Sequence, residues 1–482
     1  MTIKAVILVG GEKTGTRFRP LSMEQPKVLF PIVGKPFISH IIENFISQLD
    51  GIEPLEILLI GFHKDVSSLQ QYIKEISGKH PWVKIVYKAE PGTLGTGGGL
   101  YYFRDEILDS NNDKLFYING DVICDYPFKQ LLDFYNSHNQ SSVIYGVDPT
   151  QLLNNNLIGL TSLEPEARQK IFNKFGIIVS DKKTNEVIHY VEKPTTQFTL
   201  DTTHNVLING GIYIFNKDIF KYLERAQLGK RRASKIFLYD DLESDSVDPN
   251  SLSLELDVLK ILPQSSESKF YSFNSTSFWY LLKTPMSALL ANRYFLEQTV
   301  DKESLKGVES IIPPVQVSDS SLGLRGGYKI GPYVSFGKNV SIGNGVRIKN
   351  SIISDNVTIG DNSYIVNSII SEGVKIGKWC RIEGEASKQS VLNDIDTKTN
   401  SNLKLENNIV ILSKGVSLVI KFSLRVSLFY LIKRLNSILS TKLLCKILKI
   451  MIAFTTVVLS SLYMHTINEY IYIYINNYTL GK

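Results

Sequence analysis

Short apolar runs alternate with helical patterns over roughly the first 300 residues of the chain. Runs of four or five residues suit buried strands, and the segments between them repeat apolar residues at helical spacing. The predicted strands are Ala5–Val9, Glu56–Ile60, Val83–Tyr87, Leu115–Ile118 and Ser142–Tyr145, and the predicted helices are Ile38–Leu49, Val66–Ile76 and Phe128–Ser137. This alternation predicts an α/β fold, a Rossmann-like parallel sheet with helices on both faces. Ligands bind such sheets at the carboxyl ends of the strands.

A different period follows near residue 328. Apolar residues recur every six positions, and after a slip of one residue the pattern returns; its members are Ile330, Phe336, Ile342, Ile348, Ile359, Ile365, Ile376 and Ile382. This period does not fit an amphipathic helix. It is typical of a left-handed parallel β-helix, in which each hexapeptide forms one side of a triangular coil. An irregular β-rich domain is the alternative.

These patterns divide the chain into four parts. We expect one domain over residues 1–300, a linker containing Pro and Gly over 301–327, the β-helix over 328–412 and an atypical basic, hydrophobic tail over 413–482. The formal net charge of +6 is concentrated at the end, because residues 416–482 hold eight Lys or Arg and one Glu, which sum to +7. Residues 1–415 therefore sum to −1, which argues against a nucleic-acid-binding protein.

The tail contains an uncharged run of 19 residues, 450–468, which is just long enough to span a bilayer. Three interpretations are open: translation of non-coding sequence, a membrane tail anchor, and an ordinary packed helix. The richness in Ile, Tyr, Asn and Lys, which have AT-rich codons, favours the first. Only three cysteines occur in the chain, Cys124, Cys380 and Cys445, without metal-ligand spacing, so we expect a reducing, cytoplasmic location.

The most specific motif is a glycine-rich loop that follows the first predicted strand. Gly10 and Gly11 can bring backbone N–H groups close to phosphates, and the cations Arg17 and Lys27 follow. Two cations at such a loop can neutralise a triphosphate or a departing pyrophosphate. The loop is neither a Walker A motif nor a GxGxxG fingerprint, which argues against ATPases and dehydrogenases. A plain strand-to-helix turn would explain only the glycines.

This loop and several later segments resemble the sugar-nucleotide pyrophosphorylases, a nucleotidyltransferase family that joins a nucleoside triphosphate to a sugar 1-phosphate and releases pyrophosphate. Within it, the chain is most similar to alpha-type, regulatory GDP-mannose pyrophosphorylases (mannose-1-phosphate guanylyltransferases). The shared segments are Gly10–Arg17, Leu94–Leu100, Phe103–Asp105, His189–Pro194 and Ile208–Tyr213, and the hexapeptide repeats also match. The resemblance implies a Rossmann-like nucleotidyltransferase domain followed by a left-handed β-helix, over residues 1 to about 412.

The resemblance also implies a role for each motif residue. The nucleotide would contact Gly10, Gly11, Gly95 and Thr96, and the sugar and its phosphate would contact Gly176, Glu192, Lys193 and Asn209. Arg17 and Lys27 would be the catalytic residues at the phosphates. Asp121 would hold the cofactor Mg²⁺, which prefers oxygen ligands, although an Asp after a strand is also common in turns and helix caps.

Three departures from the catalytic pattern bear on activity. Glu12, Lys13 and Thr14 lie between Gly11 and Gly15, where catalytic members have a single residue. Leu281 stands where they have a second metal-binding Asp, and Val28 replaces a proline. A displacement of about 1 Å can cost roughly a hundredfold in rate, so the longer loop is a serious defect.

We therefore expect a chain that binds GDP-mannose and regulates a catalytic beta-type partner, in homo-oligomers and hetero-oligomers. The alternative is an active guanylyltransferase that uses GTP and mannose 1-phosphate and holds its metal with Asp121 alone. A hexapeptide acyltransferase would need a histidine on the β-helix, and none of the seven histidines falls there. A tail-anchored membrane protein would depend on residues 450–468 alone.

Overall fold

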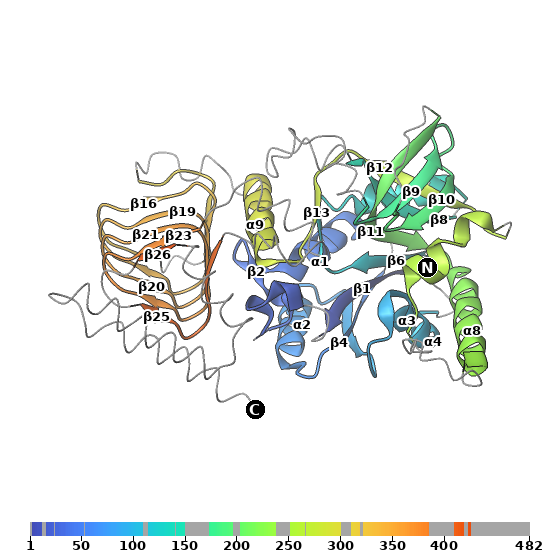
Figure 1. The fold of residues 1–482 in the computed structure, drawn as a ribbon, viewed down its shortest axis with the longest axis horizontal. Helices are drawn as coiled ribbons and strands as arrows, with labels where there is room; N and C mark the ends of the chain where they lie inside the picture. Colours follow the sequence, from blue (N-terminus) through green and yellow to red (C-terminus); the bar gives the residue numbers. More distant parts are fainter. Residues whose placement is uncertain are drawn as a thin grey trace. The chain divides into compact units, whose positions relative to one another are not determined.

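The computed structural model describes residues 2–11, 16–23, 25–52, 54–108, 114–139, 141–149, 173–195, 203–237, 251–265, 267–299, 310–318, 322–384, 409–418 and 423–425. The described residues up to 299 belong to one compact unit, and those from 310 onwards belong to a second (Figure 1). The uncharged run 450–468 and the inserted residues 12–14 lie outside the described residues. Among the described residues, no helix is both long enough and apolar enough to cross a membrane.

The first unit is built on a nine-stranded sheet in the order β10-β9-β11-β6-β1-β4-β5, with β8 beside β11 and β12 beside β8. Its strands are β1 (Ile3–Gly11), β4 (Leu55–Phe62), β5 (Lys84–Ala89), β6 (Lys114–Asn119), β8 (Ser142–Val147), β9 (Gly176–Asp181), β10 (Val187–Glu192), β11 (His204–Phe215) and β12 (Phe270–Ser275). All five predicted strands are confirmed. Two short pairs accompany the sheet: β2 (Pro31–Ile32) with β3 (Lys35–Pro36), and β7 (Val122–Cys124) with β13 (Trp279–Leu281).

The sheet is mixed rather than wholly parallel as we expected. Strands β6, β1, β4 and β5 are parallel neighbours, as the alternation with helices requires. On the other side of β6 the neighbouring strands are antiparallel: β11 pairs with β6, β9 with β11, and β10 with β9. An apolar run marks a strand as buried but carries no information on its direction, so this half could not be inferred from the pattern.

Helices cover both faces of the sheet. They are α1 (Phe37–Leu49), α2 (Ser67–Lys79), α3 (Gly95–Tyr102), α4 (Arg104–Ile107), α5 (Phe128–Ser137), α8 (Ile219–Phe237) and α9 (Pro285–Thr299); the short helices are η1 (Thr16–Phe18), η2 (Leu21–Met23), η3 (Lys27–Leu29), the π-helix η4 (Leu254–Leu259) and η5 (Leu262–Gln264). The three predicted helices correspond to α1, α2 and α5.

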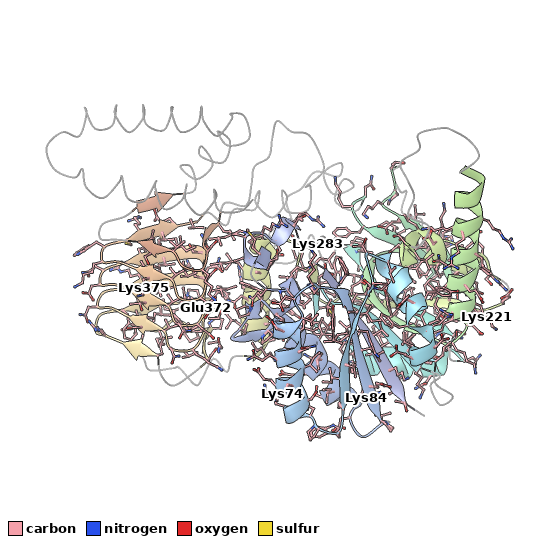
Figure 2. All side chains as sticks on the ribbon, turned by 90° about the horizontal axis from the view of Figure 1, so that it is seen from below. Lys74, Lys84, Lys221, Lys283, Glu372 and Lys375 are labelled. Atoms are coloured by element: carbon pink, nitrogen blue, oxygen red, sulfur yellow. The ribbon has the colours of Figure 1, made fainter. Side chains whose placement is uncertain are left out.

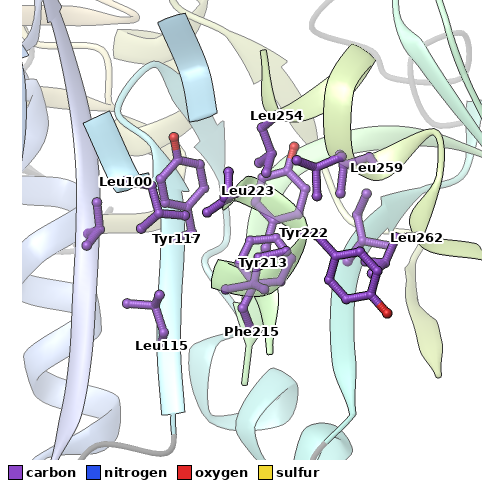
Figure 3. Packing of buried hydrophobic residues seen from close by; sticks show 14 of the residues in the cluster. Leu100, Leu115, Tyr117, Tyr213, Phe215, Tyr222, Leu223, Leu254, Leu259 and Leu262 are labelled. Carbon is purple, nitrogen blue, oxygen red and sulfur yellow. The ribbon is translucent and has the colours of Figure 1, made fainter. Parts of the chain in front are cut away.

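Successive residues of β6 show how each face is filled. The ring of Phe116 meets Phe45 of α1 and Phe128 of α5, with centroids 5.2 Å and 5.9 Å away. Tyr117 points to the opposite face, where Leu100 of α3 and Leu254 of η4 belong to the same buried cluster (Figure 3). Alternation along one strand thus supplies both cores.

The second unit is a parallel β-helix. Its strands are β14 (Val315–Val317), β15 (Gly323–Leu324), β16 (Lys329–Ile330), β17 (Val334–Phe336), β18 (Ser341–Ile342), β19 (Arg347–Ile353), β20 (Thr358–Ile359), β21 (Tyr364–Ile370), β22 (Lys375–Ile376), β23 (Arg381–Glu383), β24 (Val410–Leu412), β25 (Ser417–Leu418) and β26 (Ser423–Arg425). In the central coils, stacked strands pair residues 17 apart, as in Ser341↔Thr358 and Thr358↔Lys375. Three hexapeptides shortened by one residue give this spacing, which accounts for the slip in the repeat.

The β-helix also extends past residue 412, where we expected it to end. Strand β25 pairs with β22, and β26 pairs with β23, in the same parallel register as the preceding coils. Leu418 belongs to the buried core of the coil. The six-residue repeat could therefore not be recognised after Val416, where the composition becomes basic, although the β-helix continues to at least residue 425.

Candidate functional site

The glycine-rich loop leaves β1 beside the end of β6. These two strands are parallel neighbours, so Gly11 and Asp121 emerge at the same edge of the sheet. Gly10 has a φ of 73°, and a Cβ on Gly11 would lie 2.4 Å from the carbonyl oxygen of Phe62. Both positions therefore require glycine, and they bring the backbone of the loop to the sheet edge where phosphate binding is expected.

Lys27 joins Asp121 at this edge. Helix η3 buries Val28 and Leu29, and Lys27 at its start forms an ion pair with Asp121, with 2.9 Å between Nζ and Oδ2. Burial, the largest influence, raises the pKa of Asp121, but the charges of Lys27, Lys283 and Arg17 outweigh it and hold that pKa below its ordinary value. Asp121 is therefore ionised and surrounded by cations.

The pair β7–β13 delivers residues from far along the chain to Asp121. Leu281 lies opposite Val122, and the amide of Leu282 donates a 2.7 Å hydrogen bond to the carbonyl oxygen of Asp121. The indole of Trp279 anchors β13 by donating a 2.9 Å hydrogen bond to the carbonyl of Gly210. This register places Leu281 opposite Val122, the residue that follows Asp121 in the chain.

A second polar cluster lies across β9, β10 and β11. The hydroxyl of Tyr190 donates to Glu192 Oε2 at 2.8 Å and accepts from Asn209 Nδ2 at 3.0 Å. Asn209 Oδ1 in turn accepts from the hydroxyl of Tyr213 and the amide of Gly211, each at 3.0 Å. Burial raises the pKa of both tyrosines well above the usual range, so both hydroxyls remain donors.

Gly176 and Lys193 complete this cluster. A Cβ on Gly176 would lie 2.1 Å from the hydroxyl of Tyr190 and 2.7 Å from Glu192 Oε2, so only glycine fits. Lys193 Nζ forms a 2.8 Å ion pair with Glu192, and its charge also acts on Lys283. The four residues expected to contact the sugar and its phosphate are thus brought together, and Lys193 links them to the Asp121 group.

Gly95 and Thr96 lie at the start of α3 in a different environment. The Thr96 hydroxyl donates to Glu255 Oε2 at 2.5 Å and accepts from the amide of Leu254 at 3.0 Å. A Cβ on Gly95 would lie 2.5 Å from the carbonyl oxygen of Leu252. Through these contacts, the segment that begins at residue 251 packs against α3. A nucleotide-binding role for Gly95 and Thr96 stays a prediction.

Two family models match the chain. One, described as nucleotidyl transferase, matches residues 4–245, and one described as the GMPPB C-terminal domain matches residues 311–423. A protein of Schizosaccharomyces pombe named probable mannose-1-phosphate guanyltransferase is 35% identical over 397 residues, 81% of this chain and 87% of that protein. The chain belongs to the nucleotidyl transferase family.

Other relatives carry regulatory names. A mannose-1-phosphate guanylyltransferase regulatory subunit alpha of Dictyostelium discoideum is 36% identical over 80% of this chain and 86% of that protein. The regulatory subunit alpha-B of Danio rerio is 36% identical over 61% of this chain, and the matched region spans 63% of that protein. The expected family is therefore confirmed.

Members of this nucleotidyltransferase family use a divalent metal, and the residues around Asp121 fit one poorly. One Asp121 oxygen is held by Lys27, and Leu281 offers no oxygen ligand. Within the described part of the chain, no three His, Cys, Asp or Glu side chains group closely enough to hold a metal ion. Mg²⁺ is usually bound by one or two carboxylates together with waters and substrate phosphates, and at the position of Leu281 the described residues offer no second carboxylate beside Asp121.

Sequence reasoning gave no role to three residues that the structure makes notable: Lys283, Tyr190 and Glu90. Lys283 belongs to no motif, although it follows Leu281 by two residues, and Tyr190 lies within the shared segment His189–Pro194 without an expected role of its own. Glu90 lies at the end of β5, and a Cβ on Gly99 of α3 would lie 2.3 Å from its Oε1. That oxygen is buried without a hydrogen-bond partner among the described residues, and burial raises the pKa of Glu90 to about 7.

Proposed function

We propose that this chain is an alpha-type, regulatory chain of GDP-mannose biosynthesis, which binds GDP-mannose and regulates a catalytic beta-type partner. The observation that carries the proposal is the pairing of Leu281 with Val122, next to Asp121, because the family resemblance implies a second metal-binding Asp at the position of Leu281 in catalytic members. Removing one charge-stabilising group commonly costs about 10²–10³ in rate. The longer loop between Gly11 and Gly15 adds a second defect.

The intact polar cluster supports binding. Glu192 can accept hydrogen bonds from sugar hydroxyls, Asn209 is held in one orientation by Tyr213 and Gly211, and Lys193 can meet a sugar phosphate. Such a preorganised set binds its ligand without losing much side-chain freedom. A protein that kept these contacts and lost the carboxylate would recognise a product that it does not make.

The regulatory names of the Dictyostelium and zebrafish relatives favour the same role. A partner is part of this proposal, and we expect hetero-oligomers with a catalytic beta-type chain as well as homo-oligomers. The β-helix offers parallel coils whose strand edges are suited to such assembly.

The alternative is an active mannose-1-phosphate guanylyltransferase. The name of the fission-yeast relative favours it, and it would require Mg²⁺ at Asp121. Its chemistry would join GTP and mannose 1-phosphate and release pyrophosphate.

A paired assay of the purified full chain separates the two. Calorimetry with GDP-mannose should give saturable heat, while GDP-mannose formation from GTP and mannose 1-phosphate with Mg²⁺ should stay far below about 1 s⁻¹, an ordinary turnover. Turnover above that value establishes the alternative. The absence of binding at millimolar GDP-mannose refutes the proposal that this is a regulatory, GDP-mannose-binding chain.

A further inference from the structure

Basic side chains outnumber acidic ones at the edge where β1, β6 and β13 end. Asp121 experiences the charges of Lys27, Lys283 and Arg17, and Lys283 experiences those of Arg17, Lys27 and Lys193. Lys27 pairs with Asp121, and Lys193 pairs with Glu192. Counting these six side chains, the site carries an excess of two positive charges.

The backbone fixes the place of Lys283. It follows β13, whose pairing with β7 is closed by the hydrogen bond from Leu282 to Asp121. The amide of Lys283 donates to the hydroxyl of Ser287 at 2.9 Å, at the start of α9, and its Nζ lies 5.9 Å from the centroid of the Phe175 ring. Figure 2 shows Lys283 over the middle of the unit, whereas Lys74 and Lys221 lie at its periphery.

We infer that Lys283 takes the place of the divalent cation, so that the diphosphate of a nucleotide sugar is bound by Lys283, Arg17 and Lys193 without a metal. The inference rests on the proposed binding of GDP-mannose and specifies how the same site holds it. It also accounts for the poor fit of a metal, because the position that would supply a second carboxylate is apolar and an ammonium group lies two residues further on.

The electrostatics are consistent with an anionic ligand. Burial lowers the pKa of Lys283 most, Asp121 opposes that effect, and the neighbouring cations add to it. An ammonium group in such surroundings lacks sufficient negative charge around it. A diphosphate diester is a dianion at neutral pH, and it would supply that charge through charge-assisted hydrogen bonds.

The test is calorimetry of GDP-mannose binding to the full chain, with EDTA in one series and excess Mg²⁺ in the other. We expect the wild-type dissociation constants to agree within about threefold. Lys283→Met should weaken binding about 10-fold to 100-fold in both series, the range for a lost charged hydrogen bond. Lys283→Arg, which keeps the charge, should retain most of the affinity, and Lys74→Met on the exposed face of α2 is the matched control.

Each outcome discriminates. Binding that requires Mg²⁺ in the wild type overturns this inference and leaves the proposed function standing. Unchanged affinity of Lys283→Met, in protein whose circular dichroism and melting temperature match the wild type, also overturns it. If Lys283→Met unfolds, the dissociation constants of the wild type and Lys283→Arg, measured with EDTA and with Mg²⁺, still test whether binding depends on a metal. No binding in any series refutes the proposed function itself.

Discussion

Gly176 lies so close to Tyr190 that a single added methyl group would collide with the tyrosine hydroxyl, 2.1 Å from the new Cβ. The same hydroxyl connects Glu192 to Asn209. Gly176→Ala should therefore displace the centre of the proposed sugar site. We expect a loss of about 1–3 kcal/mol in the free energy of unfolding, typical of overpacking, and GDP-mannose binding weakened at least tenfold.

Gly229→Ala in α8 is a control for the added methyl group, because nothing lies within 4 Å of a Cβ there. Alanine in a helix is favoured over glycine by up to about 1 kcal/mol, so this variant should be slightly stabilised. Thermal melting and calorimetry measure both effects. Unchanged binding by Gly176→Ala would contradict the assignment of this cluster to the sugar.

Lys193 offers a test of the phosphate side of the same cluster. Lys193→Ala removes a cation but leaves the hydrogen bonds among Tyr190, Glu192 and Asn209 in place. We expect GDP-mannose binding to weaken by about 1–3 kcal/mol in calorimetry, with a melting temperature close to that of the wild type. Mannose without phosphate should bind both proteins equally, and a selective loss of mannose binding would argue that Lys193 contacts the sugar instead.

Glu90 should make stability depend on pH. Its pKa is raised from an ordinary 4.5 to about 7 by burial, so the folded chain holds a proton that the unfolded chain releases between these values. The free energy of unfolding therefore falls as pH rises from about 4.5 to about 7. Glu90→Gln should flatten this dependence and raise the melting temperature at pH 8 by about 1–3 °C relative to the wild type.

The comparison requires melting curves of both proteins at pH 5, 6 and 8. Glu43→Gln is a suitable control, because Glu43 lies on α1 and forms an ion pair with Lys35. Parallel pH profiles for the wild type and Glu90→Gln would mean that Glu90 does not titrate in this range.

The end of the β-helix gives a prediction about the tail. A chain ending at 415 loses Leu418 from the core, together with the hydrogen bond that the amide of Gly377 donates to the carbonyl oxygen of Leu418 at 2.8 Å. We expect this truncation to destabilise the second unit by about 2–4 kcal/mol. A chain ending at 425 should melt within about 1 °C of the full chain.

The same pair of truncations tests whether residues 426–482 are foreign to the fold. Failure of the chain ending at 425 to fold or to bind GDP-mannose would show that they belong to it. Sequencing the mature transcript across this boundary gives an independent answer. If the tail is translated non-coding sequence, the mature transcript does not encode it.

Structural features that impose a periodic or local pattern could be predicted from the sequence, whereas features that depend on the pairing of strands distant in the chain could not. Strands β1 and β4 and the six-residue repeat were predictable because burial imposes a regular pattern on them. Lys283 was not, because its role arises from the pairing of β13 with β7, which are more than 150 residues apart. Tyr190 and Tyr213 look like ordinary core aromatics until their hydroxyl partners are known.

The structure brings together Gly176, Glu192 and Asn209, which the resemblance assigns to the sugar, and it shows how they are held. Asn209 owes its orientation to the irregular pairing of β11 with β8 between Asn209 and Tyr213, where Gly211 takes a φ of 75°. A local irregularity of this kind follows from the packing of three strands. No single segment encodes it.

If the chain has the proposed regulatory role, the register of β7 and β13 also restricts how this gene could regain catalysis. No leucine codon becomes an aspartate codon by one nucleotide change, and Leu281→Asp alone would bring a carboxylate to within two residues of the Lys283 ammonium group, where an ion pair forms more readily than a metal site. Lys283 and the inserted loop residues would have to change as well. Each variant with only some of these changes would still lack turnover, so selection could act only on ligand binding. In such a lineage the loss of catalysis would be difficult to reverse.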